Sequence, residues 1–266
     1  MEGPIVKLNK PVEEKTLVIT CFPSIGMVSS IVAHYLIDNL ELEFVGGVID
    51  DRLPPIAIVK NGEPLPPIRA YSGKRKCSIR GCDEVILLMS ELVVPDPLVH
   101  RLVWSMLEWS KENNIEAGVL IDAFAKDGLS GSLDGSEPVI NYEDTEAIDV
   151  IGIGANETTR ELLSSMGIQL AESGVVRGMN GGLLAEAMRR GIDTMSLMVE
   201  ADPRFPDARA AAALIENLNL LLPTIDLDHK PLLQEAEEIE LSIKAMMEGM
   251  DLNLEHSSGP NSMLYG

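Results

Sequence analysis

The sequence has 266 residues with 45% hydrophobic side chains, enough to bury a substantial core as one large domain or one domain with an appendage. Its formal net charge of −21 argues against nucleic acids and anionic membranes as partners, since both are bound through clustered Lys and Arg. No run reaches the roughly 18 apolar residues of a membrane span, and residues 1–15 lack a signal-peptide pattern, so a cytoplasmic protein is expected.

Short apolar runs alternate along the chain with segments of helical periodicity. This alternation predicts the α/β class, with a mostly parallel sheet covered by helices on both faces. The predicted strands are residues 16–22, 44–49, 56–60, 65–71, 85–89, 117–124, 150–155 and 194–199. Residues 174–177 are also predicted to belong to the sheet. The predicted helices are residues 27–39, 96–113, 157–166 and 181–190.

Three local signals mark turns and caps. Asn61-Gly62 tolerates positive φ at both positions, which predicts a two-residue hairpin. Residues 126–137 are rich in Gly, Ser and Asp and predict a surface loop. Asn156 is the predicted cap of the helix that follows it.

Motifs for enzymatic chemistry are weak. Gly152-Ile153-Gly154 begins like a dinucleotide fingerprint, but the third glycine is absent and Glu157 stands where pyrophosphate would lie. Residues 178–182, Gly-Met-Asn-Gly-Gly, are able to cradle an anion at a helix start, and close packing of the helix on a strand explains the glycines equally well.

Nucleophile and carboxylate candidates are no stronger. Ser24 follows a strand but lacks the glycine two residues earlier that a nucleophile elbow requires. Asp50-Asp51 is a possible carboxylate pair, although adjacent acids ahead of Pro54 more often form a solvated turn. The four histidines fall in no metal or nucleophile motif. No enzyme activity, cofactor or metal is therefore expected from these motifs.

The three cysteines, Cys21, Cys77 and Cys82, are odd in number and show neither metal-ligand nor redox spacing. We interpret them as thiols that serve as small hydrophobes, as in a reducing cytoplasm.

The C-terminal part of the sequence carries a heptad pattern after Pro223. Its apolar positions are Leu232, Ala236, Ile239, Ile243, Met246 and Met250. Such a stripe pairs with a copy of itself or packs on the chain's own body, and both alternatives remain open. Residues 254–263 predict a flexible linker. The chain is accordingly divided into a body (1–225), a helix (226–250) and a tail (251–266).

The last three residues of the sequence are Leu264, Tyr265 and Gly266. An apolar anchor, an amphipathic phenol and a free carboxylate form a known mode of peptide capture by a waiting pocket. The alternative is a frayed terminus. We expect these three residues to bind another protein.

Four motifs, in this order and spacing, resemble the archaeal family related to eukaryotic proteasome assembly chaperones. They are Phe22-Pro23-Ser24-Ile25-Gly26, Leu53-Pro54-Pro55, residues 178–184, and Phe205-Pro206-Asp207 followed by Ala210-Ala211-Ala212. The resemblance covers roughly residues 6–222. It implies a three-layer α/β fold similar to nucleoside phosphorylases without a known catalytic centre, oligomers, and a role in assembling or activating the 20S proteasome.

The resemblance also bears on the tail, because proteasome activators of several kinds end in a hydrophobe, a tyrosine and any residue. By position, Leu264 is the hydrophobe, Tyr265 the aromatic and Gly266 the carrier of a carboxylate that pairs with a lysine between α-ring subunits. Two rival functions remain: a phosphate- or nucleoside-binding enzyme of phosphorylase-like fold, and a scaffold for another assembly factor.

Overall fold

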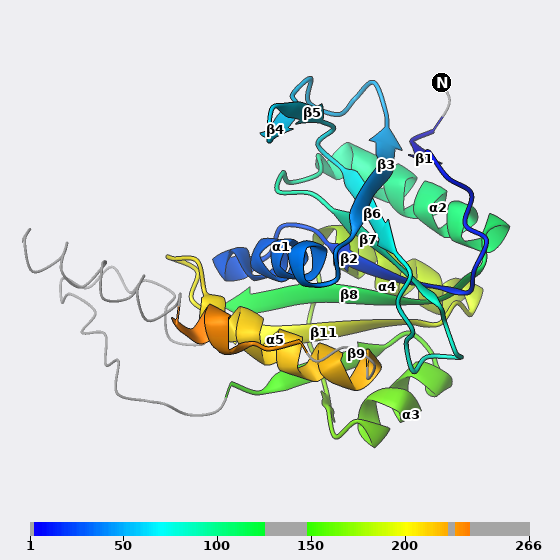
Figure 1. Ribbon diagram of the computed structural model, residues 1–266. Coiled ribbons are helices and arrows are strands. Elements are labelled where there is room, and N and C mark those ends of the chain that lie inside the picture. Colours follow the sequence, from blue (N-terminus) through cyan, green and yellow to red (C-terminus); the bar gives the residue numbers. More distant parts are fainter. Residues whose placement is uncertain (1–2, 126–147, 223–226, 235–266) are drawn as a thin grey trace, which may run out of the picture.

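The computed structural model describes residues 3–125, 148–222 and 227–234. These residues form one large sheet with helices on both faces (Figure 1), so the predicted α/β class and its three layers are confirmed. The expected surface loop at 126–137 lies outside the described residues.

Nine described strands make up this sheet. In spatial order they are β1 (Ile5–Leu8), β3 (Glu43–Ile49), β6 (Arg69–Gly73), β7 (Glu84–Met89), β2 (Thr16–Cys21), β8 (Ile115–Ala125), β11 (Thr194–Ala201), β9 (Val150–Gly154) and β10 (Gln169–Leu170). The central strands β7, β2, β8 and β11 are parallel. Antiparallel pairings add β6, β3 and β1 on one side and β9 on the other. The parallel centre places the strand ends of β2, β7 and β8 at one edge.

Two apolar clusters fill the space between the sheet and the helices. Helices α1 (Val28–Asn39), α3 (Glu157–Ser165) and α5 (Ala208–Leu221) pack on one face. Helices α2 (Asp96–Glu112) and α4 (Gly178–Arg190) pack on the other. The alternation of β8 shows the division, because Leu120 belongs to the second cluster and Ile121 to the first.

Side chains at the helix starts explain where several helices begin. Asn156 accepts a hydrogen bond from the Thr159 amide at 3.0 Å and forms a capping box, which confirms the predicted cap of α3. Asp207 caps α5 by accepting from the Ala210 amide at 2.9 Å. Helix α4 ends at Arg190 and is followed by Gly191, whose φ of 69° glycine adopts without steric cost.

The hairpin after β3 confirms one prediction and corrects another. Strands β4 (Ile58–Lys60) and β5 (Glu63–Leu65) flank Asn61-Gly62, whose φ angles are 51° and 83°. Residues 65–71, predicted as one strand, are instead split between β5 and β6. Pro66 and Pro67 explain the break, because neither has an N–H group to donate to a strand ladder.

Smaller differences concern the ends of the chain's elements. Residues 174–177 form no strand, and α4 begins at Gly178, three residues before the predicted Gly181 start. Strands β1 and β10 were not predicted, since they are short edge segments without an alternating apolar pattern. A short 3-10 turn, η1 (Ile25–Met27), precedes α1. Among the described helices, none combines the length and apolar character of a membrane span.

Candidate functional site

The predicted docking residues Leu264, Tyr265 and Gly266 lie outside the described residues. So do five of the six positions of the heptad stripe, namely Ala236, Ile239, Ile243, Met246 and Met250. The sixth position, Leu232, is described and is 5% exposed within the chain's own core. At this one position the stripe packs on the chain's own body, and for the other five positions both alternatives stay open.

We call residues 227–234 the root of the C-terminal segment. Leu227 and Leu232 belong to the apolar cluster that α1 and α5 cover. The Asn219 side chain donates to the Leu227 carbonyl at 3.0 Å and accepts from the Leu227 amide at 2.9 Å. The Tyr35 hydroxyl donates to the Asp228 carbonyl at 2.7 Å. The root is therefore held against the body by both apolar contacts and backbone hydrogen bonds.

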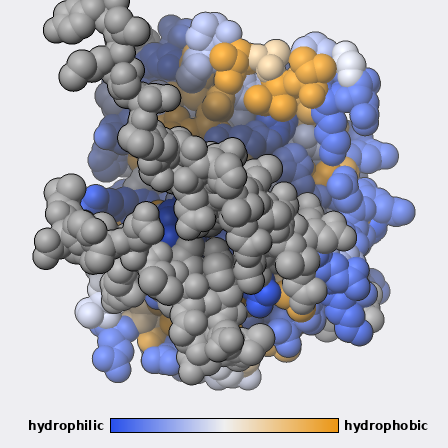
Figure 2. Space-filling model, turned by 90° about the vertical axis from the view of Figure 1, so that its left-hand side faces the viewer, coloured by the Kyte–Doolittle hydropathy of each residue, from blue (hydrophilic) through white to orange (hydrophobic). Residues whose placement is uncertain are grey.

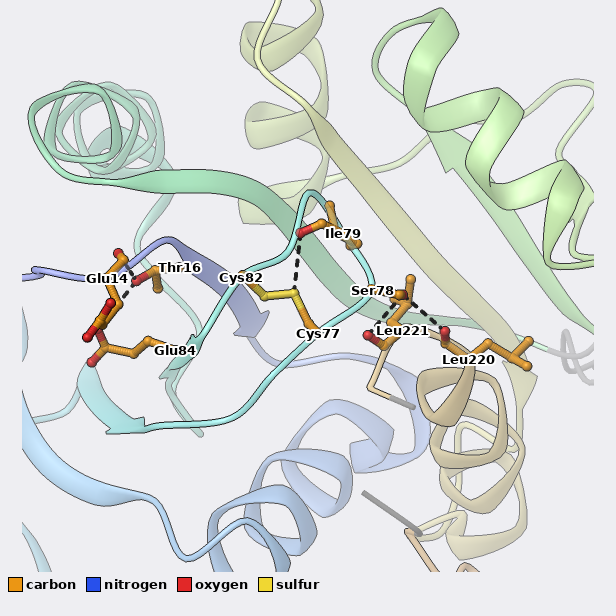
Figure 3. Close-up of a disulfide and its surroundings, with 9 residues drawn as sticks. All are labelled: Glu14, Thr16, Cys77, Ser78, Ile79, Cys82, Glu84, Leu220 and Leu221. Carbon is orange, nitrogen blue, oxygen red and sulfur yellow. Dashed lines mark hydrogen bonds between the residues drawn. A yellow bond between two sulfur atoms is a disulfide. The ribbon is translucent and has the colours of Figure 1, made fainter. Parts of the chain in front are cut away.

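A second set of contacts closes the C-terminal end of α5, next to the root. The loop of residues 74–83 between β6 and β7 presents Ser78 to this end (Figure 3). The Ser78 amide donates to the Leu221 carbonyl at 2.9 Å, and its hydroxyl lies 3.2 Å from the carbonyls of Leu220 and Leu221. These contacts satisfy carbonyls that a helix end leaves without an intrahelical partner.

The same loop contains a disulfide between Cys77 and Cys82, whose Cα atoms are 5.2 Å apart (Figure 3). The interpretation of these two residues as free thiols is therefore wrong. A tight turn brings them together, with φ of 49° at Arg80 and 67° at Gly81, and sequence spacing alone does not reveal such a turn. Cys21 remains a free, buried thiol, and burial raises its pKa. Two of the three cysteines therefore no longer support the expectation of a reducing cytoplasm.

The glycines of the dinucleotide-like sequence are explained by packing. A Cβ on Gly154 would lie 2.6 Å from the Arg160 backbone nitrogen, and one on Gly152 would lie 3.0 Å from Leu163. Helix α3 therefore approaches β9 too closely for larger residues. No open phosphate cradle remains at this turn.

Ser24 and Asp50 also have structural partners. Ser24 Oγ accepts a hydrogen bond from the Ser29 amide at 3.0 Å at the start of α1. Asp50 accepts from the backbone amide of Arg52 at 2.9 Å and from its Nε at 2.7 Å, and this hydrogen bonding lowers the Asp50 pKa. Asp50 thus stabilises a turn, as the alternative predicted, but its side chain is only 2% exposed and is not solvated, unlike that of Asp51.

The two glycines near the start of α4 are needed for close packing. A Cβ on Gly181 would lie 2.3 Å from the Val176 carbonyl oxygen, and one on Gly182 would lie 2.9 Å from Val103 on α2. The loop at Val176 and helix α2 therefore leave no room for a side chain at these glycines. The sequence had suggested packing of the helix on a strand, and this explanation is wrong.

Motifs that lie far apart in the sequence meet in space. Gly26, with φ of 60°, accepts a hydrogen bond from the Asp207 amide at 2.8 Å. Farther along the same edge of the sheet, Phe22 and Pro23 share a cavity of about 90 Å³ with Gly178 and Asn180. Both loops of the proposed phosphate grip thus line one cavity. Asp96 and Asp122 line it as well, which disfavours a phosphate dianion.

A buried charged network lies at the same edge of the sheet, beside the start of β6 and the end of β7. Arg69 is 1% exposed and pairs with Glu91, whose Oε1 is 3.2 Å from His34 Nε2. Burial favours the neutral form of Glu91, but hydrogen bonds from His34 and Arg69 outweigh it and hold the Glu91 pKa at about 2. Within the described residues, no group of three or more His, Cys, Asp or Glu is arranged to hold a metal.

The β4–β5 hairpin and the segment just before it expose apolar side chains. Ile56 is 41% exposed and Val59 70%. Figure 2 shows hydrophobic side chains gathered along the upper part of this side of the molecule, whereas most of its other coloured surface is hydrophilic. Exposed apolar surface of this kind is typical of protein–protein contacts.

Comparison with solved structures shows two archaeal relatives of the same fold. The chain is 29% identical to PbaA of Pyrococcus furiosus, described as an archaeal homolog of proteasome-assembly chaperone, with 96% of each chain covered and a TM-score of 0.76. PbaB of Pyrococcus furiosus, described as an archaeal proteasome activator, has the same fold, with a TM-score of 0.74 and 18% identity. This similarity covers 93% of this chain and 100% of PbaB.

Sequence comparison points to the same group of proteins. An uncharacterized protein of Methanocaldococcus jannaschii is 28% identical over 235 residues, which cover 88% of this chain and 87% of the relative. The model of the PAC2 family matches residues 18–247, from the second strand through the root and into the C-terminal segment. This match spans most of the sequence, and the chain therefore belongs to the PAC2 family.

Proposed function

We propose that this protein is a cytoplasmic proteasome assembly chaperone or activator that docks Leu264-Tyr265-Gly266 into pockets of the 20S α-ring. The observation that carries the proposal is the similarity to PbaA over 96% of both chains, combined with the hydrophobe-Tyr-Gly ending of this sequence. Family membership supports a proteasome partner, and the tripeptide supplies the contact.

The proposal includes a homo-oligomer, because one tripeptide buries little surface and binds weakly. Several tails on one symmetric assembly make the later contacts intramolecular, which strengthens binding by about 10²–10⁴-fold. The exposed apolar side chains of the β4–β5 hairpin are suited to subunit contacts. The heptad positions beyond the root are further candidates for them. Light scattering coupled to size exclusion would measure the subunit number, and a monomer at micromolar concentration would refute this part.

Binding of the full chain to purified 20S particles tests the docking contact. Tyr265→Ala and deletion of residues 264–266 should each weaken binding by about 30-fold, the effect of losing about 2 kcal/mol at an interface anchor. One residue added after Gly266 should also weaken binding, because it displaces the carboxylate. Met263→Ala is the matched control, since it changes the neighbouring residue and leaves the tripeptide intact. Unchanged binding of the Tyr265→Ala protein would contradict docking through the tail.

Peptide hydrolysis separates an activator from an assembly chaperone. An activator should raise hydrolysis by finished 20S particles, whereas an assembly chaperone should accelerate particle formation from separate α and β subunits and leave the finished particle unchanged. Co-purification with a stable partner other than the proteasome, without binding to 20S particles, would favour the scaffold function instead.

A further inference from the structure

The cavity of about 90 Å³ at the carboxyl edge of the sheet is lined by Asn180, which has a buried polar atom without a partner among the described residues. Asn180, 4% exposed, donates from Nδ2 to the Ile121 carbonyl at 3.0 Å. Because a carbonyl accepts only, this bond fixes the orientation of the amide, and Oδ1 is left without a hydrogen bond within the described residues. Buried polar atoms of this kind usually have a partner, so Oδ1 points to a missing donor.

The cavity also has an anion-attracting side. Gly178, Met179 and Asn180 form the first turn of the 13-residue helix α4, where backbone N–H groups lack intrahelical partners. Arg177 precedes this turn, lines the cavity and forms no ion pair or side-chain hydrogen bond within the described part of the chain. A helix N-terminus and a free guanidinium together favour a carboxylate or a similar small anion.

The remaining polar lining attracts a cation. Asp122 and Asp96 both line the cavity, and Asp122 accepts from the Ala123 amide at 2.9 Å. Burial raises the Asp122 pKa more than the hydrogen bonds from the Asn180 side chain and the Ala123 amide lower it, so a cationic ligand group that pairs with this carboxylate would relieve the remaining cost of its charge. Asn180 Oδ1 is a second acceptor for the same N–H donors.

We propose that this cavity binds a small α-amino acid zwitterion, with its carboxylate toward Arg177 and the α4 N-terminus and its ammonium toward Asp122 and Asn180. Both charges are then neutralised, which neither a phosphate nor a simple amine achieves. The cavity of about 90 Å³, roughly the volume of three water molecules, limits the ligand to a small molecule. Phe22 and Val99 provide an apolar wall for a short side chain.

Titration calorimetry of the full chain with L-alanine tests this proposal. We expect saturable binding of one molecule per chain. Propionate lacks the ammonium and ethylamine lacks the carboxylate, and each should bind at least about 10-fold more weakly, since a charged hydrogen bond contributes about 1.5 kcal/mol or more. Inorganic phosphate should not compete with L-alanine.

Variants assign the two ends of the ligand. Asp122→Asn keeps an acceptor for the Ala123 amide, and Arg177→Gln changes an exposed side chain, so both proteins should fold. Each should weaken L-alanine binding at least about 10-fold. Lys111→Gln, at the opposite end of α2, is the control and should leave binding unchanged.

Three results would overturn the proposal: no saturable binding of L-alanine up to about 10 mM, which corresponds to only about 3 kcal/mol; equal binding of propionate; or phosphate binding that Arg177→Gln abolishes and Asp122→Asn strengthens. The last result would identify a simple anion site. Tyr265→Ala should bind L-alanine normally, so failure of this proposal and failure of proteasome docking are distinguishable.

Discussion

The two edges of the sheet differ in how their polar groups are satisfied. At the amino edge, Ser78 binds the last carbonyls of α5, a disulfide closes the loop, and Asn219 pairs with both backbone groups of Leu227. At the carboxyl edge, Asn180 Oδ1, Arg69 Nη1 and Glu91 Oε2 are buried without partners within the described residues. At the amino edge these groups are paired, although Arg190 Nη2 at the end of α4 is also buried without a partner among the described residues. The edges differ in that Asn180, with its unpaired Oδ1, lines a cavity at the carboxyl edge.

The largest expected effect of a substitution concerns the buried ion pair at the carboxyl edge. Arg69→Leu should lower the free energy of unfolding by about 3 kcal/mol, because it leaves the partly buried Glu91 carboxylate without its guanidinium partner. Urea denaturation measures this change. The double variant Arg69→Leu/Glu91→Leu should recover most of the loss, and a double variant as unstable as the single one would show that packing, and not the unpaired charge, is responsible.

The disulfide gives the largest expected effect at the amino edge. Cys77→Ser/Cys82→Ser should lower the free energy of unfolding by about 2 kcal/mol, since a cross-link over five residues removes little entropy from the unfolded chain. Thermal unfolding with and without reductant measures it. Reductant should destabilise the wild-type protein and leave the double serine variant unchanged; insensitivity of the wild type would mean that the two sulfurs are not bonded in solution.

The acid sensitivity of the carboxyl edge follows from Glu91. Its folded pKa of about 2 lies below the ordinary glutamate value of 4.5, so its ion pair stabilises the protein above pH 4.5 and loses this effect as the pH falls toward 2. We expect the wild type to lose about 1–2 kcal/mol relative to Glu91→Gln across this window, after allowance for solvent screening. Parallel denaturation curves for the two proteins between pH 5 and 2 would contradict it.

The last expected effect, similar in size to that of Glu91, is at the root. Asn219→Ala removes both hydrogen bonds to Leu227 and should cost about 1–2 kcal/mol. It should also speed amide exchange at Leu227 and Leu232 more than at the central strands. Asn217→Ala is the matched control on the same helix, because it removes one hydrogen bond within α5, to the Ala213 carbonyl at 2.9 Å. Equal exchange in both variants would show that Asn219 does not hold the root.

Local patterns were sufficient for much of the fold. The apolar runs predict the central strands, and Asn156 and Asn61-Gly62 predict a cap and a hairpin that the structure contains. These features depend on neighbours within a few residues, so the sequence carries their signal. The missed strands β1 and β10 lie at sheet edges, where pairing with a distant strand decides their conformation and their own composition does not.

The candidate sites divide in the same way. The sequence by itself determined the α/β class, the family resemblance and the tripeptide Leu264-Tyr265-Gly266, because each is written in the order of residues along the chain. Only the tertiary structure decided that Cys77 meets Cys82, that Leu232 is buried in the body, and that Asp122 and Asn180 share a cavity with Phe22. These three features depend on long-range contacts and on backbone turns. Such contacts and turns bring together side chains whose spacing in the sequence shows no pattern.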